Sequence, residues 1–151
     1  RYIKLGNKND YGIYTEYGET ILPPEYSKIE LLYGRMFLTY KDYRYGITDF
    51  KGKVLIPNIC DDIYMPDKGT LKIKYLGNWY ELNNVTPESL SMPDIIVKSE
   101  DNEFTLSDFL DATALMSQYS VLTLSDYLIK VISSNIPNLK SAKRSMIYSI
   151  L

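Results

Sequence analysis

Short runs of aromatic and branched apolar side chains, separated by polar residues, fill the first part of the chain. Residues 35–40, 43–48 and 53–56 are such runs, rich in aromatic and branched side chains. Runs of this length and composition are typical of β-strands. The gaps between them, 41–42 and 49–52, are short enough for hairpin turns. The pattern therefore predicts about three antiparallel strands in one structural unit.

The pattern recurs along the chain at a fixed period, the distance from Tyr11 to Tyr45. With this shift the pair Tyr11-Gly12 falls on Tyr45-Gly46, and a second shift reaches Trp79. Similarity at a fixed period of roughly 20 to 50 residues indicates stacked repeats, because one unit cannot bury its own apolar face. We therefore predict that the three aromatic residues belong to the core, with a ligand-binding role as the alternative. The two glycines would let another backbone or ring lie against their strands.

The second half of the unit contains a glycine-centred turn and then an apolar stretch that ends in proline, as in Ile21-Leu22-Pro23-Pro24-Glu25-Tyr26. Together with the aromatic-glycine pair, this order resembles the bacterial WG repeat, also called the KWG repeat, over about residues 1–84. In the first two copies tyrosine stands where that family usually has tryptophan. The third copy is less similar to the pattern, since Tyr80 replaces its glycine. Members of the family are mostly repeat regions without an assigned catalytic role. The resemblance therefore implies a binding or scaffold surface within a larger bacterial protein.

The composition changes where the repeats end, since residues 1–84 hold 12 of the 15 tyrosines, all 8 glycines and the only tryptophan. The next segment, 85–104, reads as a linker with a candidate last strand at 95–97, and its prolines discourage a helix. Beyond it the apolar spacing changes to the helical period. Three amphipathic helices are predicted within the tail 105–151, at 105–116, 123–132 and 139–150. The expected fold class is therefore α+β: antiparallel β repeats of about 34 residues followed by a three-helix C-terminal element that caps the repeats or docks elsewhere.

Catalytic chemistry has few candidate residues in this chain. Histidine is absent, which removes the commonest general base, the usual catalytic triads and most zinc sites. The single cysteine, Cys60, excludes an internal disulfide and takes a half-buried packing position in the repeat register. Adjacent acids such as Asp61 and Asp62 point in different directions along a strand, which argues against a catalytic pair. We therefore expect no catalytic, cofactor-binding or metal-binding site, and no enzyme activity.

The charge balance indicates the class of partner. The net charge is −2, and residues 1–84 carry 12 basic and 11 acidic side chains. Phosphate binding normally shows a basic excess, so single-stranded nucleic-acid binding through tyrosines is only a second alternative. No run approaches the roughly 18 apolar residues of a membrane-spanning helix. We therefore expect no membrane partner and favour the cytoplasm as the location.

The repeats hold more tyrosines than one small core can accommodate, so some must be exposed. Exposed tyrosines are common anchors of protein interfaces. The candidate partner-binding residues are Tyr33, Tyr40 and Tyr43. Their partner would be another protein or another part of a longer chain, since the sequence starts within a repeat and is expected to be a fragment. The alternative is a regulatory or protease-substrate role in a larger enzyme system, with the exposed linker at 98–104 recognised or cut.

Overall fold

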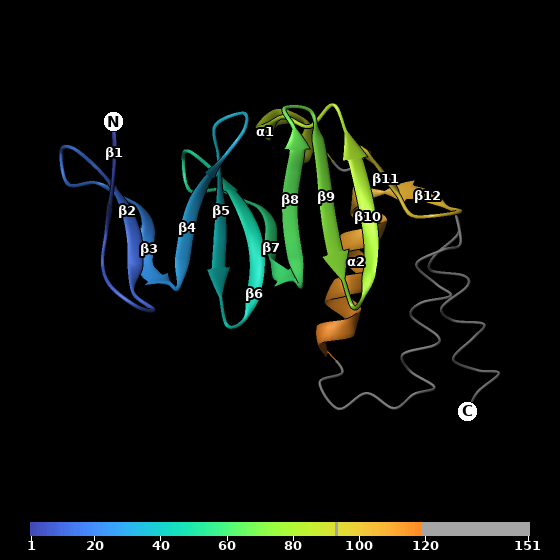
Figure 1. Ribbon diagram of the computed structural model, residues 1–151, viewed down its shortest axis with the longest axis horizontal. Coiled ribbons are helices and arrows are strands. Elements are labelled where there is room, and N and C mark those ends of the chain that lie inside the picture. The colour runs from blue at the N-terminus through green and yellow to red at the C-terminus, as the bar shows by residue number, and fades with distance from the viewer. Residues whose placement is uncertain (93, 119–151) are drawn as a thin grey trace. The chain divides into compact units, whose positions relative to one another are not determined.

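The computed structural model describes residues 1–92 and 94–118, and the chain divides into two compact units, Arg1–Ser91 and Met92–Leu151. In the first unit, three groups of antiparallel strands follow one another from blue to green in Figure 1. The first group consists of β1 (Tyr2–Leu5), β2 (Tyr11–Thr15) and β3 (Thr20–Tyr26). The second consists of β4 (Lys28–Leu32), β5 (Met36–Lys41), β6 (Arg44–Asp49) and β7 (Val54–Cys60). The third consists of β8 (Asp62–Asp67), β9 (Thr70–Tyr75) and β10 (Asn78–Asn83).

Strands that lie one repeat period apart correspond to one another, so that β1, β5 and β9 begin at Tyr2, Met36 and Thr70. The first two repeats each supply four strands, rather than the three expected from the apolar runs. The fourth strand, β4 or β8, crosses into the sheet of the next repeat, where it pairs antiparallel with β5 or β9. The expectation of three strands missed this strand, although Lys28, Ile29, Glu30 and Leu31 alternate between polar and apolar residues as a half-buried strand does.

The aromatic-glycine pair lies opposite a bulge in the first two repeats. The register of β2 and β3 jumps at Gly12, where three residues of β3 face this single residue. A Cβ on Gly12 would lie 2.7 Å from the carbonyl oxygen of Leu22. Gly46 takes the same place opposite β7, where a Cβ would lie 2.7 Å from the carbonyl oxygen of Ile56. Another backbone therefore lies directly against each glycine, in space that any side chain would fill.

The third repeat departs from this plan. Tyr80 stands where the first two repeats have glycine, and its side chain is buried at 8% exposure. The segment that would form the bulged strand forms α1 (Pro87–Leu90) instead. Thr86 caps this helical turn, and Pro87 takes its first position. Proline is tolerated there because the backbone N–H at that position would have no intrahelical acceptor. The expectation that the prolines discourage a helix is therefore wrong at Pro87.

The four-stranded sheet supplies part of the core of the first unit. Met36 and Ile47 are fully buried, and Phe37 is 3% exposed. Phe37 belongs to an aromatic cluster with Tyr2 and Phe50, in which the ring centroids lie 4.7 to 5.9 Å apart. Such pairs stabilise beyond the area that they bury. The cluster therefore joins the first group of strands to the second.

The three aromatic residues of the repeat motif do not share one environment. Tyr11 and Tyr45 are half-buried, but Trp79 is 43% exposed, so its side chain does not lie in the core. Its ring meets that of Tyr64 edge-on, with centroids 5.5 Å apart. Successive side chains of a strand point to opposite faces, and in β10 the buried face is taken by Tyr80. The alternation therefore turns Trp79 outward.

In its described part, the second unit contains a hairpin and one helix. The strands β11 (Ile96–Lys98) and β12 (Glu103–Thr105) pair antiparallel. The Ser99 N–H donates to the Asn102 carbonyl oxygen at 2.9 Å and closes the turn between them. The stretch 98–104, expected to be an exposed linker, is therefore mostly part of this hairpin.

The helix α2 (Leu106–Gln118) follows the hairpin directly. Thr105 Oγ1 accepts a hydrogen bond from the Asp108 N–H at 3.1 Å, and Asp108 places a negative charge in the first turn. This charge interacts favourably with the positive end of the helix dipole. Leu106 and Phe109 are each 2% exposed, so the apolar face of the helix is buried.

The expected fold class, α+β with a three-helix C-terminal element, is wrong. The described residues form mostly antiparallel sheets, with twelve strands and two helices, α1 and α2. Neither described helix is long and apolar enough to cross a membrane. The predicted helices at 123–132 and 139–150 lie outside the described residues. Of the three predicted helices, the one at 105–116 lies within the described residues, where it forms α2.

Candidate functional site

The three candidate tyrosines do not form one surface. Tyr33 lies in the loop between β4 and β5, and Tyr43 lies in the turn between β5 and β6, at the opposite end of β5 (Figure 1). The strand has 6 residues, which separates its ends by roughly 20 Å. Tyr33 is 52% exposed and Tyr43 is 81% exposed. A single small partner contact therefore cannot use both residues.

Tyr40 has a structural role in the sheet. It pairs with Tyr45 across β5 and β6, and the two ring centroids lie 4.5 Å apart. The ammonium group of Lys28 lies 5.5 Å from the centre of the Tyr40 ring. Cross-strand aromatic pairs and cation–π contacts of this kind stabilise a sheet. Tyr40 is half-buried by these contacts and offers little free surface to a partner.

Tyr33 lines an apolar groove. The groove has a volume of about 420 Å³ and is lined by Leu31, Leu32, Tyr33 and Met65, none of which carries a charge. Leu31 is 71% exposed, although leucine is usually buried. Leu32 and Met65 are half-buried and form the remaining lining. Four uncharged side chains that are partly or largely exposed give this groove the composition of a protein-contact site.

The sequence contains a sign of this groove that the count of tyrosines does not use. Alternation in β4 breaks at its end, where Leu31, Leu32 and Tyr33 follow one another. Because neighbouring strand residues point to opposite faces, consecutive apolar residues cannot all face one core. Such a run is therefore either exposed in part, as here, or buried on both faces, as Met36, Phe37 and Leu38 are in β5. The fourth lining residue, Met65, comes from β8 and has no signal of this kind.

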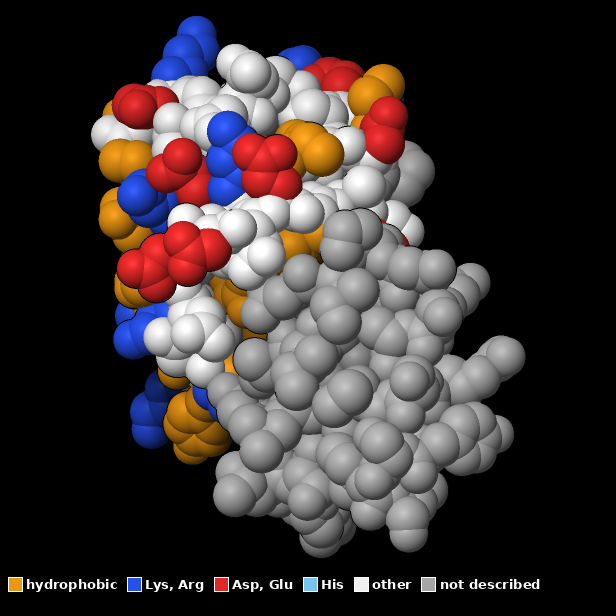
Figure 2. Space-filling view, turned by 90° about the vertical axis from the view of Figure 1, so that its right-hand side faces the viewer, with side chains coloured by type: hydrophobic (Ala, Val, Ile, Leu, Met, Phe, Trp, Pro, Cys, Tyr) orange, Lys and Arg blue, Asp and Glu red, His pale blue; other side chains and the backbone are white. Residues whose placement is uncertain are grey.

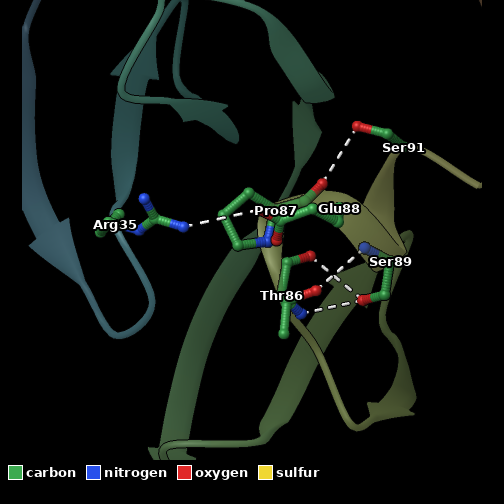
Figure 3. A network of polar contacts seen from close by, with 6 residues as sticks. All are labelled: Arg35, Thr86, Pro87, Glu88, Ser89 and Ser91. Carbon is green, nitrogen blue, oxygen red and sulfur yellow. Dashed lines mark hydrogen bonds and ion pairs between the residues drawn. The ribbon is translucent and has the colours of Figure 1, made fainter.

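A second, polar cleft of about 390 Å³ lies beside α1 and includes Arg35, Asp49, Lys53, Glu88 and Ser91 in its lining. Figure 3 shows Arg35 reaching Glu88, with the nearest nitrogen and oxygen 3.5 Å apart. Both side chains are about 70% exposed, at 73% and 70%. Ion pairs this exposed contribute little to stability. Acids and bases share the cleft, so its charge selects neither an anion nor a cation.

The helical turn beside this cleft is fixed by its own hydrogen bonds. Thr86 Oγ1 accepts from the Ser89 N–H at 3.0 Å, and Ser89 Oγ accepts from the Thr86 N–H at 2.8 Å. Ser91 Oγ donates to the Pro87 carbonyl oxygen at 3.0 Å (Figure 3). These polar groups hold α1 in place, since each has a partner within the turn. The arrangement therefore explains the cleft without a ligand.

Cys60 is not available for chemistry near neutral pH. Its side chain is fully buried, and this burial, with the neighbouring Asp61 carboxylate, raises the pKa of the thiol from 9.0 to about 12. Burial likewise raises the pKa of Tyr75 from 10.0 to about 12. Only a thiolate is strongly nucleophilic, so Cys60 is a packing residue. Within residues 1–92 and 94–118, no cluster of three or more Cys, Asp or Glu side chains could hold a metal ion.

The raised pKa of Cys60 links stability to alkaline pH. In the unfolded chain the thiol loses its proton near pH 9.0, whereas the folded protein holds the proton until about pH 12. Above pH 9.0 the unfolded state therefore binds fewer protons than the folded state, and the free energy of unfolding falls as the pH rises. Below that pH this contribution is fully present.

Comparisons with protein-family models, with curated proteins and with solved structures found no match to this chain. The resemblance of residues 1–84 to the WG repeat therefore stays a prediction that rests on its own motifs. The function must be argued from the geometry of the groove and from the surface around it.

Proposed function

We propose that the chain is a non-catalytic protein-binding module, whose partner inserts apolar side chains into the groove of Leu31, Leu32, Tyr33 and Met65. The observation that carries this proposal is the exposure of Leu31, 71%, beside that of Tyr33, 52%, in one uncharged groove. Covering these side chains removes apolar surface from water, which is the main favourable term in association. A tyrosine anchor also loses little side-chain entropy on binding.

A protein partner fits this groove better than a nucleic acid does. The lining offers neither lysine nor arginine for phosphate contacts. On the face shown in Figure 2, basic and acidic side chains of the described residues are interspersed rather than gathered by sign. Nucleic-acid binding depends on a basic surface that follows the phosphate backbone. The binding energy here would instead come from a few buried apolar contacts.

Affinity capture from the native host with matched variants tests the proposal. The test variant carries Leu31→Ser and Tyr33→Ser, and the control carries Tyr17→Ser and Val54→Ser. The control residues are also exposed, at 84% and 55%, but lie outside the groove. A protein bound by the parent chain and the control should bind the test variant about 30-fold more weakly, as expected for loss of an interface anchor.

Two results would contradict the proposal. Equal binding of the partner to the test variant and to the control would remove the groove as the binding site. Co-purification of nucleic acid, with no protein bound, would remove protein binding as the function. Circular dichroism of both variants checks that the sheets are retained.

A further inference from the structure

The strand β4, which supplies most of the groove, lies at an edge of its sheet. It pairs with β5 on one side and has no strand on its other side among the described residues (Figure 1). β8, the equivalent strand one repeat later, is also an edge strand of its sheet. A complete repeat precedes β8 in the chain, and no strand of that repeat pairs with the outer edge of β8. The free edge is therefore a feature of the repeat itself.

The turn between β5 and β6 determines which backbone groups of β5 face β4. Asp42 and Tyr43 form this turn with φ of 53° and 64°, as in the tight turn that joins the strands of a hairpin directly. In such a hairpin the residues that flank the turn, here Lys41 and Arg44, exchange both of their backbone hydrogen bonds. This pattern alternates along a strand, so the even-numbered residues of β5 hydrogen-bond to β4.

The backbone groups of β4 alternate in the same way. The register sets the even-numbered residues of β4 opposite those of β5, so the N–H and C=O groups of Ile29 and Leu31 point to the free edge. The Ile29 carbonyl oxygen accepts a hydrogen bond from Lys4 Nζ at 3.4 Å, which agrees with this direction. Leu31 is 71% exposed, and no described turn or loop hydrogen-bonds to its backbone. Leu31 therefore offers a backbone donor and acceptor beside the groove.

The free edge of β4 lacks two features that block strand addition at β8. Met65, the equivalent of Leu31 one repeat later, is followed by Pro66, and the register of β8 shifts between Tyr64 and Asp67. Proline and bulges are common protections of edge strands. β4 contains no proline and pairs with β5 in an unbroken register. An added strand therefore fits beside β4 better than beside β8.

On the basis of the function proposed for the groove, we propose that its partner binds as an extended strand, antiparallel to β4 and paired with Leu31. Antiparallel pairing is the more stable arrangement per residue, and the partner residue opposite Leu31 exchanges two backbone hydrogen bonds with it. The partner residues opposite Leu31 and Leu32 are apolar, because both leucines line the groove. Strand addition of this kind takes its affinity from backbone hydrogen bonds and its specificity from side chains.

Glu30 selects a basic partner residue. Its side chain is exposed and forms no ion pair with any described lysine or arginine. Directly opposite side chains of an antiparallel pair lie about 5 Å apart at Cβ, so a lysine or arginine opposite Glu30 can reach the carboxylate. From its N-terminus to its C-terminus, the partner strand therefore carries two apolar residues followed by a basic one.

The experiment uses the full chain and the synthetic peptide Thr-Ser-Val-Ile-Lys-Thr-Ser, whose valine, isoleucine and lysine are expected opposite Leu32, Leu31 and Glu30. Calorimetry measures binding, and nuclear magnetic resonance measures hydrogen exchange at single amides. We expect saturable binding and slower exchange of the Leu31 amide, because its N–H gains an acceptor. The Glu30 amide already donates to β5, so its exchange should change little. Glutamate in place of the peptide lysine sets two like charges opposite each other and should weaken binding about tenfold.

Methylation of single peptide nitrogens separates strand pairing from apolar contact with the groove. A methyl group on the isoleucine nitrogen removes the donor that pairs with the Leu31 carbonyl oxygen, and it should weaken binding at least about tenfold. The lysine nitrogen of the peptide points away from β4, because neighbouring residues of a strand face opposite edges. A methyl group on that nitrogen is the matched control and should leave binding unchanged.

The outcomes distinguish a failure of strand pairing from a failure of the groove. The variant with Leu31→Ser and Tyr33→Ser should bind the peptide about 30-fold more weakly, since it lacks the apolar contacts. Equal binding of both methylated peptides, with weak binding to this variant, would overturn strand pairing and leave the groove as the site. Equal binding of the peptide to this variant and to the parent chain would count against the groove itself.

Two further results would overturn strand pairing alone. One is the absence of saturable peptide binding, because affinity capture tests the groove independently. The other is protection of the Leu31 amide that grows with chain concentration without peptide, because a second copy of the chain would then occupy the edge.

Discussion

Replacing Gly46 with alanine tests whether the repeat depends on close approach of two backbones. An alanine Cβ at this position would lie 2.7 Å from the Ile56 carbonyl oxygen and 2.9 Å from both the Asn58 nitrogen and the Pro57 carbonyl carbon. All three are backbone atoms of the bulge, so no flexible side chain can move aside. Overpacking costs about 1 to 3 kcal/mol, and a lost backbone hydrogen bond costs about 1 kcal/mol more. We expect Gly46→Ala to lower the free energy of unfolding by about 2 to 4 kcal/mol.

Gly69→Ala is the matched control. No described atom lies within 4 Å of a Cβ at Gly69, and its backbone is outside the left-handed region. This substitution should change the free energy of unfolding by about 0.5 kcal/mol or less. Urea unfolding followed by far-ultraviolet circular dichroism measures both variants. The midpoint for Gly46→Ala should fall by about 1 to 2 M, given the usual denaturant dependence of small proteins.

Equal stability of the Gly46→Ala and Gly69→Ala variants would refute the reasoning. Gly12→Ala provides an independent repetition in the first repeat, where the nearest backbone atom is the Leu22 carbonyl oxygen, also at 2.7 Å. A large loss at Gly46 with none at Gly12 would show that the bulge is not a shared requirement of the two repeats.

Three further changes probe other features. Cys60→Ala should reduce the fall in the free energy of unfolding between pH 9.0 and 10.0, because in this range the thiol of the unfolded chain loses its proton before Tyr75 does. Urea unfolding at both pH values measures the fall, and an equal fall in the parent chain and the variant would contradict the raised pKa of Cys60. Asp49→Ala should lower the free energy of unfolding by about 1 to 2 kcal/mol in urea unfolding, because the Asp49 carboxylate accepts hydrogen bonds from the Lys51 and Lys53 N–H groups at 2.9 Å. An unchanged free energy of unfolding would show that these hydrogen bonds do not stabilise the protein. Arg35→Ala should change stability by about 0.5 kcal/mol or less in the same assay, since its ion pair is exposed, and a larger loss would show that the ion pair holds α1.

The repeat period and most of the strand positions could be predicted from the sequence because they depend on local patterns. Gly12 and Gly46 recur with aromatic neighbours and prolines at fixed distances, and the structure places bulged backbone at both glycines. In the third repeat Tyr80 stands at the position of these glycines, and α1 takes the place of the bulged strand. The glycine of each aromatic-glycine pair therefore indicates, from the sequence, where another strand lies against the backbone.

The pairing of the fourth strand of one repeat with the sheet of the next could not be predicted in the same way. Whether β4 joins its own repeat or the next depends on pairing with β5, which is a contact between segments and not a property of either segment. The outward position of Trp79 has a similar origin, because its equivalent Tyr45 is half-buried in a different sheet. Periodicity identifies corresponding positions, but the neighbours of those positions differ from repeat to repeat.

The candidate site was predictable in part. Tyr33 lies in the groove, whereas Tyr40 is held by Tyr45 and Lys28, and Tyr43 lies at the other end of β5. Composition indicates that some tyrosines must be exposed, but not which of them share a surface. Met65 joins the groove only because β8 comes near the end of β4 in the fold.

Photo-crosslinking from the groove tests the protein-binding account most directly. The photoreactive amino acid p-benzoylphenylalanine would replace Tyr33 in one variant and the more exposed Tyr17, at 84% exposure, in the other. Irradiation in the native host should yield a covalent adduct with one protein from position 33 and none from position 17. An adduct from position 17 alone, or no protein adduct from position 33, would contradict the account.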